Sequence, residues 1–408
     1  MRPRQILRTL GLTERRRHGS LSSCHDIEDL RAAARRRLPR AVFDYVDGGA
    51  DSEITLTANR VAYERWRFLP RILIDVSEAD LTGEVFGVRL PVPLGLAPTG
   101  YTRMTHPDGE LAVAAAAAAY DLPYCLSTLA TTSIEEVGGT GHDKLWFQLY
   151  VTKDRDLTRS LIDRAAKAGF QGLEVSVDTA VSGQRVRDLR NGLTIPPRLG
   201  PRALLDIAAH PRYWYGMLRA PELTFANVAG TAVAAGRTVA DITARFDAAL
   251  SWDDLADIRA RWPGPLLLKG PIRPADAVRA VSMGVDGLHL SNHGGRQLDR
   301  CVPPLDLLPA VRRAVGGETV IVVDSGLRHG SDLAIALALG ADLCMVGRPY
   351  LYGLAAGGRR GVERALELLT AELRRTLQLI GVTSIGELRA HGNAIIMEEH
   401  QSWTHAAF

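Results

Sequence analysis

The chain has 408 residues, 46% of them hydrophobic and 23% charged, and its formal net charge is +3. This length is enough to bury one large core, and a net charge so close to zero does not require a nucleic-acid partner. The four cysteines form no CxxC pair, which argues against a disulfide framework or a metal site and suits a reducing compartment.

The beginning of the chain is rich in arginine, including Arg2, Arg4 and Arg8, and we predict a solvated, disordered tail over 1–25. Attraction to an anionic membrane surface and an organellar presequence are the alternatives. No apolar stretch follows these arginines, so a secretory signal is not expected. The longest apolar run, over 112–120, is too short to cross a bilayer and is typical of a barrel helix.

Residues up to about 90 form a basic, helical lead-in, and a repeating pattern follows. A short apolar strand, a polar or glycine-rich turn and an alanine-rich helix alternate, which indicates βα units around a parallel sheet. We expect helices over 155–168, 274–283 and 330–339, and a helical tail over 362–389 outside the barrel. Eight strands are predicted, enough to close a (β/α)8 barrel, over 94–97, 124–127, 146–149, 173–177, 266–269, 287–290, 320–323 and 343–346.

A long insertion over 179–250 follows the fourth strand and exceeds the length of an ordinary βα loop. It contains Pro196-Pro197 and an aromatic stretch from Tyr213 to Leu218 between Arg212 and Arg219. This stretch is either a packed lid or a patch that meets a membrane surface, because aromatic rings beside arginines suit the headgroup layer. We therefore predict one barrel domain over 26–390, with this insertion, and a C-terminal tail over 391–408.

Polar residues follow every predicted strand, and in barrels of this type the chemistry lies at those strand ends. The most informative segment runs from Ser291 to Gln297 after the sixth strand. His293 can accept a proton near neutral pH, Arg296 can hold a carboxylate in a bidentate pair, and Asp178 can orient the histidine. The chain has no GxSxG motif, so a hydrolase is not predicted.

Two further signals concern a cofactor. Lys269 ends an apolar strand, where it is either a Schiff-base nucleophile or a fixed positive charge beside a cofactor, and its position alone leaves both open. Gly326 and Arg328 follow the seventh strand, and Gly347 and Arg348 follow the eighth. These two loops commonly hold a phosphate in barrels, with backbone N–H groups and a helix N-terminus.

These residues resemble those of the FMN-dependent 2-hydroxy-acid dehydrogenases and oxidases, from about residue 26 to residue 390. The segment from Ser291 to Gln297 is the most specific match. The chain is most similar to the membrane-associated L-lactate dehydrogenases, because of Asp324-Ser325-Gly326 and the stretch from His210 to Trp214. The matching motifs are Phe43-Asp44-Tyr45, Ala97-Pro98-Thr99-Gly100, Phe147-Gln148-Leu149-Tyr150, Val177-Asp178, Leu268-Lys269-Gly270 and Gly347-Arg348-Pro349.

The resemblance implies a role for each matching residue. His293 is the base, Asp178 pairs with it, and Tyr150 contacts the substrate hydroxyl. Tyr45, Arg185 and Arg296 hold the substrate carboxylate. Lys269 lies beside N1 and O2 of the flavin, which favours electrostatics over a Schiff base. The implied FMN-binding residues are Pro98, Thr99, Gly100, Ser127, Gln148, Ser176, Lys269, Ser291, Asp324, Gly326, Arg328, Gly347 and Arg348.

The activity that follows is oxidation of an L-2-hydroxy acid, L-lactate above others, with electrons passing from FMN to a quinone or another acceptor. Gly100, Ser176, Leu129 and Val46 depart from residues common in the family, which bears on the substrate and on oxygen reactivity. The alternatives are an O2-using oxidase or monooxygenase, a peptide-maturing flavoenzyme and, in another class, a Schiff-base lyase. We expect a cytoplasmic homo-oligomer, a tetramer, in peripheral contact with the inner face of the cell membrane.

Overall fold

The computed structural model describes residues 21–192, 206, 208–231, 233, 241 and 244–399, apart from the side chain at 393. The arginines before residue 21, Pro196-Pro197 and residues 400–408 lie outside the described residues. The end of the predicted disordered tail is folded. Leu21–Ser23 form a short 3-10 helix, and Cys24 is buried, with its carbonyl accepting hydrogen bonds from Arg364.

Eight parallel strands close into a barrel, as the sequence predicts. Strand β4 pairs with β11, which joins the first strand of the barrel to the last, and the other neighbours follow in chain order. Every predicted strand is present, with each end within one residue of its expected place. The strands are β4 (Leu94–Leu96), β5 (Tyr124–Ser127), β6 (Leu145–Leu149), β7 (Gly172–Ser176), β8 (Leu266–Gly270), β9 (Gly287–Leu290), β10 (Val320–Val323) and β11 (Leu343–Val346).

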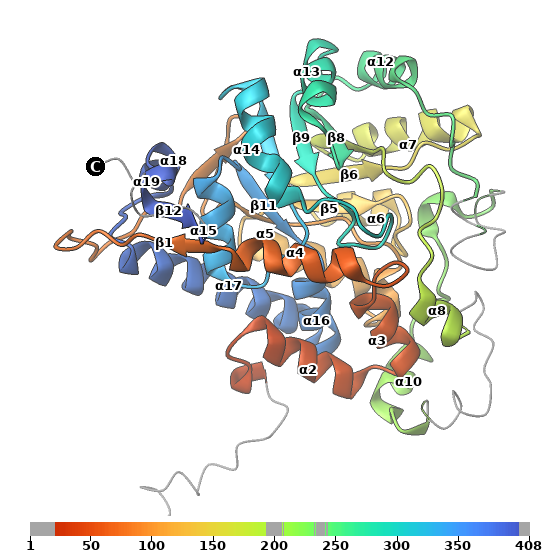
Figure 1. Ribbon diagram of the computed structural model, residues 1–408. Helices are drawn as coiled ribbons and strands as arrows, with labels where there is room; N and C mark the ends of the chain where they lie inside the picture. Colours follow the sequence, from red (N-terminus) through yellow and green to blue (C-terminus); the bar gives the residue numbers. More distant parts are fainter. Residues whose placement is uncertain are drawn as a thin grey trace, which may run out of the picture.

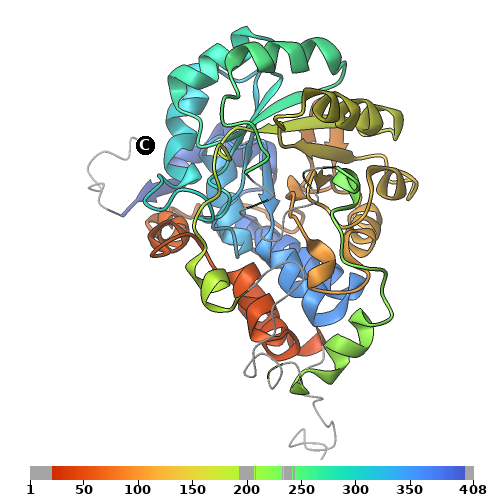
Figure 2. The same ribbon diagram turned by 90° about the vertical axis from the view of Figure 1, so that its right-hand side faces the viewer.

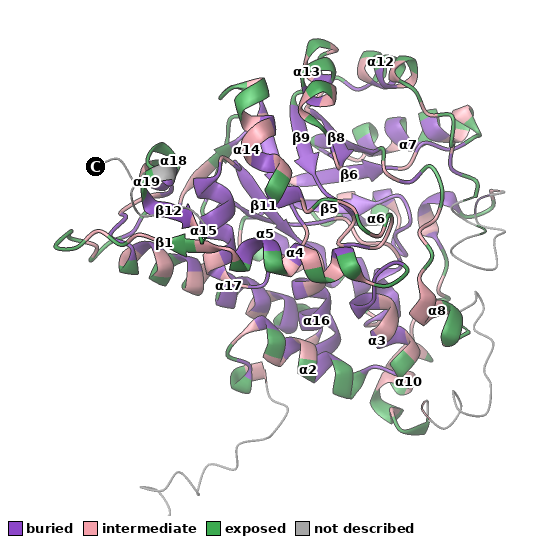
Figure 3. Ribbon diagram, viewed as in Figure 1, coloured by how far each residue is buried: buried purple, intermediate pink, exposed green. Residues whose placement is uncertain are grey.

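Helices surround the barrel and cover the outward-facing side chains of the strands (Figure 1). In Figure 3 the strands at the centre are buried, whereas the helices are exposed along their outer faces. The three helices predicted by range are α7, α13 and α15. The surrounding helices are α5 (Gly109–Ala119), α6 (Ile134–Gly138), α7 (Arg155–Lys167), α12 (Trp252–Arg261), α13 (Pro274–Ser282), α14 (Pro304–Val315), α15 (Gly330–Ala338), α16 (Arg348–Gly357) and α17 (Arg359–Leu379).

The N-terminal end of the barrel is closed by a hairpin of β2 (Gly83–Val85) and β3 (Val88–Leu90). Between these strands Phe86 has its ring centroid 5.8 Å from that of Trp146, which points into the barrel. Leu267, Val322 and Met345 complete a small apolar cluster at this end. Because apolar packing fills this end, the polar chemistry is confined to the other one.

The predicted helical lead-in contains α2 (Ile27–Arg37), α3 (Arg40–Asp47) and α4 (Ile54–Glu64). It is followed by β1 (Trp66–Phe68), which pairs antiparallel with β12 (Ile396–Glu398) from within the predicted C-terminal tail. The helical tail predicted over 362–389 is divided. Helix α17 ends before Gly381, which has a positive φ of 71°, and α18 (Ile385–Ala390) and α19 (Gly392–Ile395) follow.

The described part of the insertion contains α8 (Val186–Arg190) and α10 (Pro211–Met217), and a 3-10 helix at Ala226–Val228. In both views α10 lies at the periphery of the molecule (Figure 1 and Figure 2). Asp206 in this segment accepts a hydrogen bond from the backbone N–H of Arg40, which connects the insertion to α3. None of the helices in the described part of the chain is both long enough and apolar enough to cross a membrane.

Candidate active site

A pocket opens at the C-terminal ends of the barrel strands, where the polar residues of the sequence meet. Side chains from most of the strand ends line it, together with Tyr45 from the lead-in and Arg185 and Phe246 from the insertion. The predicted site residues that line the pocket are Tyr45, Pro98, Thr99, Gly100, Ser127, Tyr150, Arg185, Lys269, His293, Arg296, Asp324, Gly326, Arg328, Gly347 and Arg348. The structure thus brings most of the predicted site together.

His293 is held between two partners. Its Nδ1 lies 2.7 Å from Asp178 Oδ2, and its Nε2 lies 2.9 Å from the hydroxyl of Tyr150. A carboxylate only accepts hydrogen bonds, so Nδ1 carries a proton toward Asp178, and Nε2 can accept a hydrogen bond from the Tyr150 hydroxyl. Burial and the charge of Asp178 raise the pKa of Tyr150 above its ordinary value, so this hydroxyl stays protonated.

The backbone places this histidine in an unusual conformation. His293 has a positive φ of 57°, in the region that L-residues with a side chain rarely occupy, and Gly294 and Gly295 continue the turn. The hydroxyl of Ser291 accepts a hydrogen bond from the N–H of His293 at 3.1 Å. Ser291, a predicted FMN-binding residue, is fully buried and supports the turn that carries His293.

Two guanidinium groups lie over the ring of Tyr45, that of Arg296 at 4.9 Å and that of Arg185 at 5.8 Å from its centroid. Arg296 Nη1 donates to the carbonyls of Tyr45 and Gly48, which fixes the plane of the group. Burial and the neighbouring Arg185 lower the pKa of Arg296. Two adjacent positive charges in a buried pocket favour an anionic ligand between them.

Gln148 occupies the centre of a short chain of hydrogen bonds. Its Oε1 accepts from the Ser127 hydroxyl at 3.0 Å, and its Nε2 donates to the Ser176 hydroxyl at 3.0 Å. All three residues are buried, and Ser127 is the member that lines the pocket. The arrangement fixes amide and hydroxyl groups along one wall, as expected for recognition of a flat polar ring.

Lys269 points into the barrel beneath the pocket, and its side chain is 2% exposed. Its Nζ donates to Asp324 Oδ2 at 2.6 Å. Burial lowers the pKa of Lys269, but the Asp324 and Glu174 carboxylates together outweigh burial and raise the pKa above its ordinary value. An amine that stays protonated is a poor Schiff-base nucleophile, so the structure favours the role of a fixed positive charge.

At the other end of the pocket, α16 begins at Arg348, and no side chain caps its N-terminus at Gly347. Arg328 lies beside it with its guanidinium 5.8 Å from the ring centroid of Tyr352. Gly294 and Gly326 have positive φ values of 64° and 91°, and an added Cβ would meet Arg348 or the Asn59 carbonyl. Free N–H groups, arginines and close backbone turns are the ordinary components of a phosphate site.

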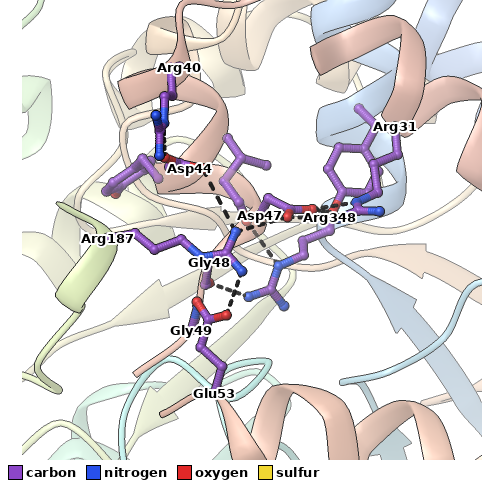
Figure 4. A network of polar contacts seen from close by, with 12 residues as sticks. Arg31, Arg40, Asp44, Asp47, Gly48, Gly49, Glu53, Arg187 and Arg348 are labelled. Carbon is purple, nitrogen blue, oxygen red and sulfur yellow. Dashed lines mark hydrogen bonds and ion pairs between the residues drawn. The ribbon is translucent and has the colours of Figure 1, made fainter. Parts of the chain in front are cut away.

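Arg348 also belongs to a network that holds the loop after α3 (Figure 4). Its guanidinium donates to the carbonyls of Val46, Gly48 and Gly294 at 2.8–2.9 Å. Asp47 accepts from Arg31 and from Arg187, which is on α8. The end of α3, which carries Tyr45, and the loop after it are therefore fixed from the lead-in, the barrel and the insertion at the same time.

The residues present fit the FMN that the resemblance implies. A flavin needs a polar wall for its ring and a positive charge near the part of the ring that becomes negative on reduction, and its phosphate needs donors at the far end. The wall at Ser127, the buried Lys269 and the start of α16 supply these features in one pocket. The described residues hold no group of histidine, cysteine, aspartate or glutamate side chains suited to a metal ion.

Three residues beside this site were not predicted from the sequence. Phe246, from the insertion, stacks on Tyr150 with ring centroids 4.5 Å apart. Glu174 on β7 and His289 on β9 are fully buried inside the barrel and contact each other. A signal for the last two was present, because a glutamate and a histidine interrupt strands that are otherwise apolar, at positions facing the barrel interior.

Comparison with known proteins agrees with this geometry. An L-lactate dehydrogenase of Vibrio cholerae serotype O1 is 41% identical over 365 residues, which cover 88% of this chain and 96% of that protein. The (S)-mandelate dehydrogenase of Pseudomonas putida is 40% identical over 364 residues, which cover 89% and 92%. A crystal structure described as the monotopic membrane protein (S)-mandelate dehydrogenase superposes with a TM-score of 0.87 at 38% identity, covering 92% of this chain and all of that one.

The family model for FMN-dependent dehydrogenases matches residues 34–394, nearly the whole described barrel and its lead-in. The matched range includes the pocket and the two loops, after β10 and after β11, that line its phosphate end. Together with identities above 30% over most of the chain, it settles the cofactor and the reaction class. The chain belongs to the family of FMN-dependent dehydrogenases that oxidise 2-hydroxy acids.

Proposed function

We propose that this protein oxidises an L-2-hydroxy acid, L-lactate to pyruvate, with His293 as the base. The observation that carries the proposal is the position of His293 between Asp178 and Tyr150. In the same pocket Arg296 and Arg185 present positive charge over the ring of Tyr45. A base and an anion site side by side suit a small molecule that carries a hydroxyl next to a carboxylate.

The substrate carboxylate docks on the edge of Arg296 that the backbone carbonyls leave available, with Arg185 and the Tyr45 hydroxyl beside it. Arg296 Nη1 is already held by Tyr45 and Gly48, so little side-chain entropy is lost when the carboxylate binds. Asp188 accepts a hydrogen bond from Arg185 Nε at 3.0 Å and holds that second guanidinium at the pocket wall.

His293 Nε2 then takes a proton from the substrate, either from the hydroxyl or from the carbon that bears it. Asp178 compensates the positive charge that develops on the imidazole, as a carboxylate does in other acid–base pairs. Tyr150 directs the substrate hydroxyl toward Nε2, and its stacking on Phe246 fixes the direction of its own hydroxyl. Bound FMN would supply the oxidant for the two electrons and the second hydrogen of the substrate, and Lys269 would supply positive charge beside its ring.

The electron acceptor that we propose is a quinone, reached at a membrane surface through α10. Tyr215 and Leu218 are exposed there, at 59% and 83%, and Arg212 and Arg219 are exposed beside them. The guanidinium of Arg219 lies 4.0 Å from the ring centroid of Tyr215. Two apolar side chains framed by arginines suit insertion at the level of anionic lipid headgroups.

Tyr213 in the same helix has another role, because its hydroxyl donates to the carbonyl of Met104 at 2.7 Å and anchors α10 to the barrel. The membrane proposal is therefore tested with Tyr215→Ser and Leu218→Ser rather than with a deletion that also removes this anchor. We expect the double variant to lose sedimentation with anionic vesicles and to keep L-lactate oxidation with a soluble acceptor. Unchanged sedimentation would show that α10 is not the contact.

The test of the reaction is an anaerobic titration of the FMN-loaded protein with L-lactate, followed by the visible flavin band. Bleaching by L-lactate and not by D-lactate supports the proposal. L-mandelate is titrated in parallel, since a mandelate dehydrogenase is among the relatives. Bleaching by mandelate alone would retain the chemistry and contradict the proposed substrate, whereas no bleaching by either would contradict both.

A further inference from the structure

Four charged side chains from four consecutive strands meet inside the barrel, beneath the pocket. They are Glu174 on β7, Lys269 on β8, His289 on β9 and Asp324 at the end of β10. Lys269 and Asp324 line the pocket, whereas Glu174 and His289 lie outside its lining, and the last two are 0% exposed. The proposed chemistry uses Lys269 alone, so the other members of this ion quartet need an explanation.

The contacts connect the four groups in a row. Glu174 Oε2 lies 2.6 Å from His289 Nδ1, and His289 Nε2 lies 3.1 Å from Asp324 Oδ2. The same Asp324 oxygen accepts from Lys269 Nζ at 2.6 Å. Lys269 Nζ also lies 3.4 Å from His289 Nε2, but the carboxylate oxygens are closer to both imidazole nitrogens. Because carboxylates only accept, the geometry is that of a doubly protonated His289.

Charge counting leads to the same protonation state. With His289 protonated, two positive and two negative groups are buried together and their charges cancel. With His289 neutral, the interior of the barrel would hold one uncompensated negative charge, which is costly in a low-dielectric environment. Burial and the charge of Lys269 lower the pKa of His289, but the Glu174 and Asp324 carboxylates together outweigh them and raise it above the ordinary value.

The order of charges matters for the cofactor. If Lys269 and Asp324 were alone, the carboxylate would cancel most of the field of the lysine at the pocket. A protonated His289 shares that carboxylate, so the three groups nearest the pocket sum to one positive charge. The compensating negative charge of Glu174 contacts the other ring nitrogen of His289 and lies outside the pocket lining, although it also acts on Lys269.

We propose that Glu174 and His289 are positioning residues for Lys269, keeping its positive charge available to the flavin ring when reduction makes that ring negative. Glu174 holds the proton on His289, His289 occupies one side of Asp324, and Lys269 is left less neutralised. The inference rests on the proposed location of Lys269 beside the flavin. It adds two residues that touch neither substrate nor cofactor and that act through Lys269.

The test uses the FMN-loaded protein and two readouts that do not depend on turnover: the midpoint potential of the bound flavin and the dissociation constant of sulfite. Sulfite adds to oxidised flavin and leaves a negative charge on the ring, so its binding reports the local positive charge. In Glu174→Gln we expect sulfite to bind about tenfold more weakly at pH 8, the order expected for one charge acting across a protein interior. For a two-electron couple this corresponds to a potential about 30 mV lower.

The pH profile separates this role from simple misfolding. Cys125 adjoins Glu174, and Lys269 and Asp324 face His289 from the other strands. Without the Glu174 charge, His289 loses its proton more readily. The weakening of sulfite binding should therefore be absent at pH 5, where His289 stays protonated, and present at pH 8. The double variant Glu174→Gln with His289→Gln removes one charge of each sign, keeps the interior neutral, and should show the same weakening at pH 8.

The matched control is Glu110→Gln. Glu110 on α5 is also 0% exposed, but it accepts hydrogen bonds from Thr131 and Thr132 in the loop before α6 and does not line the pocket. Sulfite affinity within twofold of the parent in Glu174→Gln and in the double variant at pH 8, or an equal change in Glu110→Gln, would overturn the inference. The titration of the parent protein with L-lactate does not depend on the outcome of the sulfite experiment. A failure of this inference can therefore be distinguished from a failure of the proposed function.

Discussion

The two ends of the barrel are built from the same strands and behave differently. At the N-terminal end, Trp146 and Phe86 pack in an apolar cluster that the β2–β3 hairpin closes. At the C-terminal end, His293 has a positive φ, and charged side chains from the lead-in, the barrel and the insertion converge on an open pocket. The comparison teaches that stability and chemistry are separated along each strand, so that substitutions a few residues apart should affect different properties.

The largest effect is expected at the chemical end. His293→Gln keeps a side chain of similar size but removes the base, so FMN reduction by L-lactate should slow by about a hundred- to ten-thousand-fold. Stopped-flow measurement of the flavin band under anaerobic conditions checks this. FMN binding and the melting temperature should remain those of the parent protein, and a normal reduction rate would contradict the assignment of the base.

The matching substitution at the closed end is Trp146→Ala. It removes a ring that is 6% exposed and leaves a cavity against Phe86, so the free energy of unfolding should fall by about 3–5 kcal/mol. The measurement is denaturant unfolding of the FMN-loaded protein. The rate of FMN reduction in the folded fraction should not change, and Trp252→Ala on the half-buried surface of α12 should lose less stability. A large loss of reduction rate without loss of stability would break the comparison.

A milder change at the chemical end concerns the anion site. Arg296→Lys retains one positive charge and loses the planar fork, so binding of the carboxylate loses a charge-assisted hydrogen bond of about 1.5–3 kcal/mol. We expect kcat/KM for L-lactate to fall by a corresponding factor, roughly ten- to a hundredfold, mainly through KM. Steady-state kinetics with a soluble acceptor measures both kcat/KM and KM for L-lactate. An unchanged KM would show that Arg296 does not hold the carboxylate.

The smallest effect is expected in the network around Asp47, which borders the pocket end of the barrel. Burial raises the pKa of Asp47, but hydrogen bonds from Arg31 and Tyr352 outweigh it and lower that pKa to about 2, against an ordinary value of 3.8. A depressed carboxyl pKa stabilises the fold above pH 3.8, and the stabilisation is lost as the pH falls through 2. Asp47→Asn should therefore cost on the order of 2 kcal/mol at pH 7 and about half as much at pH 3.

Unfolding curves of Asp47→Asn and the parent protein at these two pH values provide the measurement. The guanidinium of Arg31 is partly exposed, so added salt should reduce the difference between the two proteins at pH 7. A difference that is the same at both pH values would mean that the side chain acts through its shape and not through its charge.

The barrel could be predicted from the sequence because its strands are continuous apolar runs separated by helices of clear periodicity. The base, the anion site and the phosphate loops could be predicted because they follow those strands directly. The contact between Glu174 and His289 could not, since it joins residues 115 positions apart and depends on the register of β7, β8 and β9. The pairing of β1 with β12 could not either, because strands of three residues are too short to show alternation.

Phe246 illustrates a different limit. It belongs to the insertion, whose sequence shows no period, yet its ring stacks on Tyr150 and lines the pocket. Its position depends on how the end of the insertion returns to the barrel, where Thr152 forms a bridge with Phe246. Local sequence carries no signal for such a return, because tertiary contacts determine it.

The closure of the barrel has a consequence for synthesis of the chain. Strand β4 pairs with β11, so Leu96 finds its partner Val346 only after some 250 further residues have left the ribosome. Until then the edges of β4 and β10 are unpaired, and unpaired strand edges are prone to associate with other chains. A nascent chain that stops before β11 should therefore depend on chaperones. Addition of β11 pairs both open edges and should end that dependence.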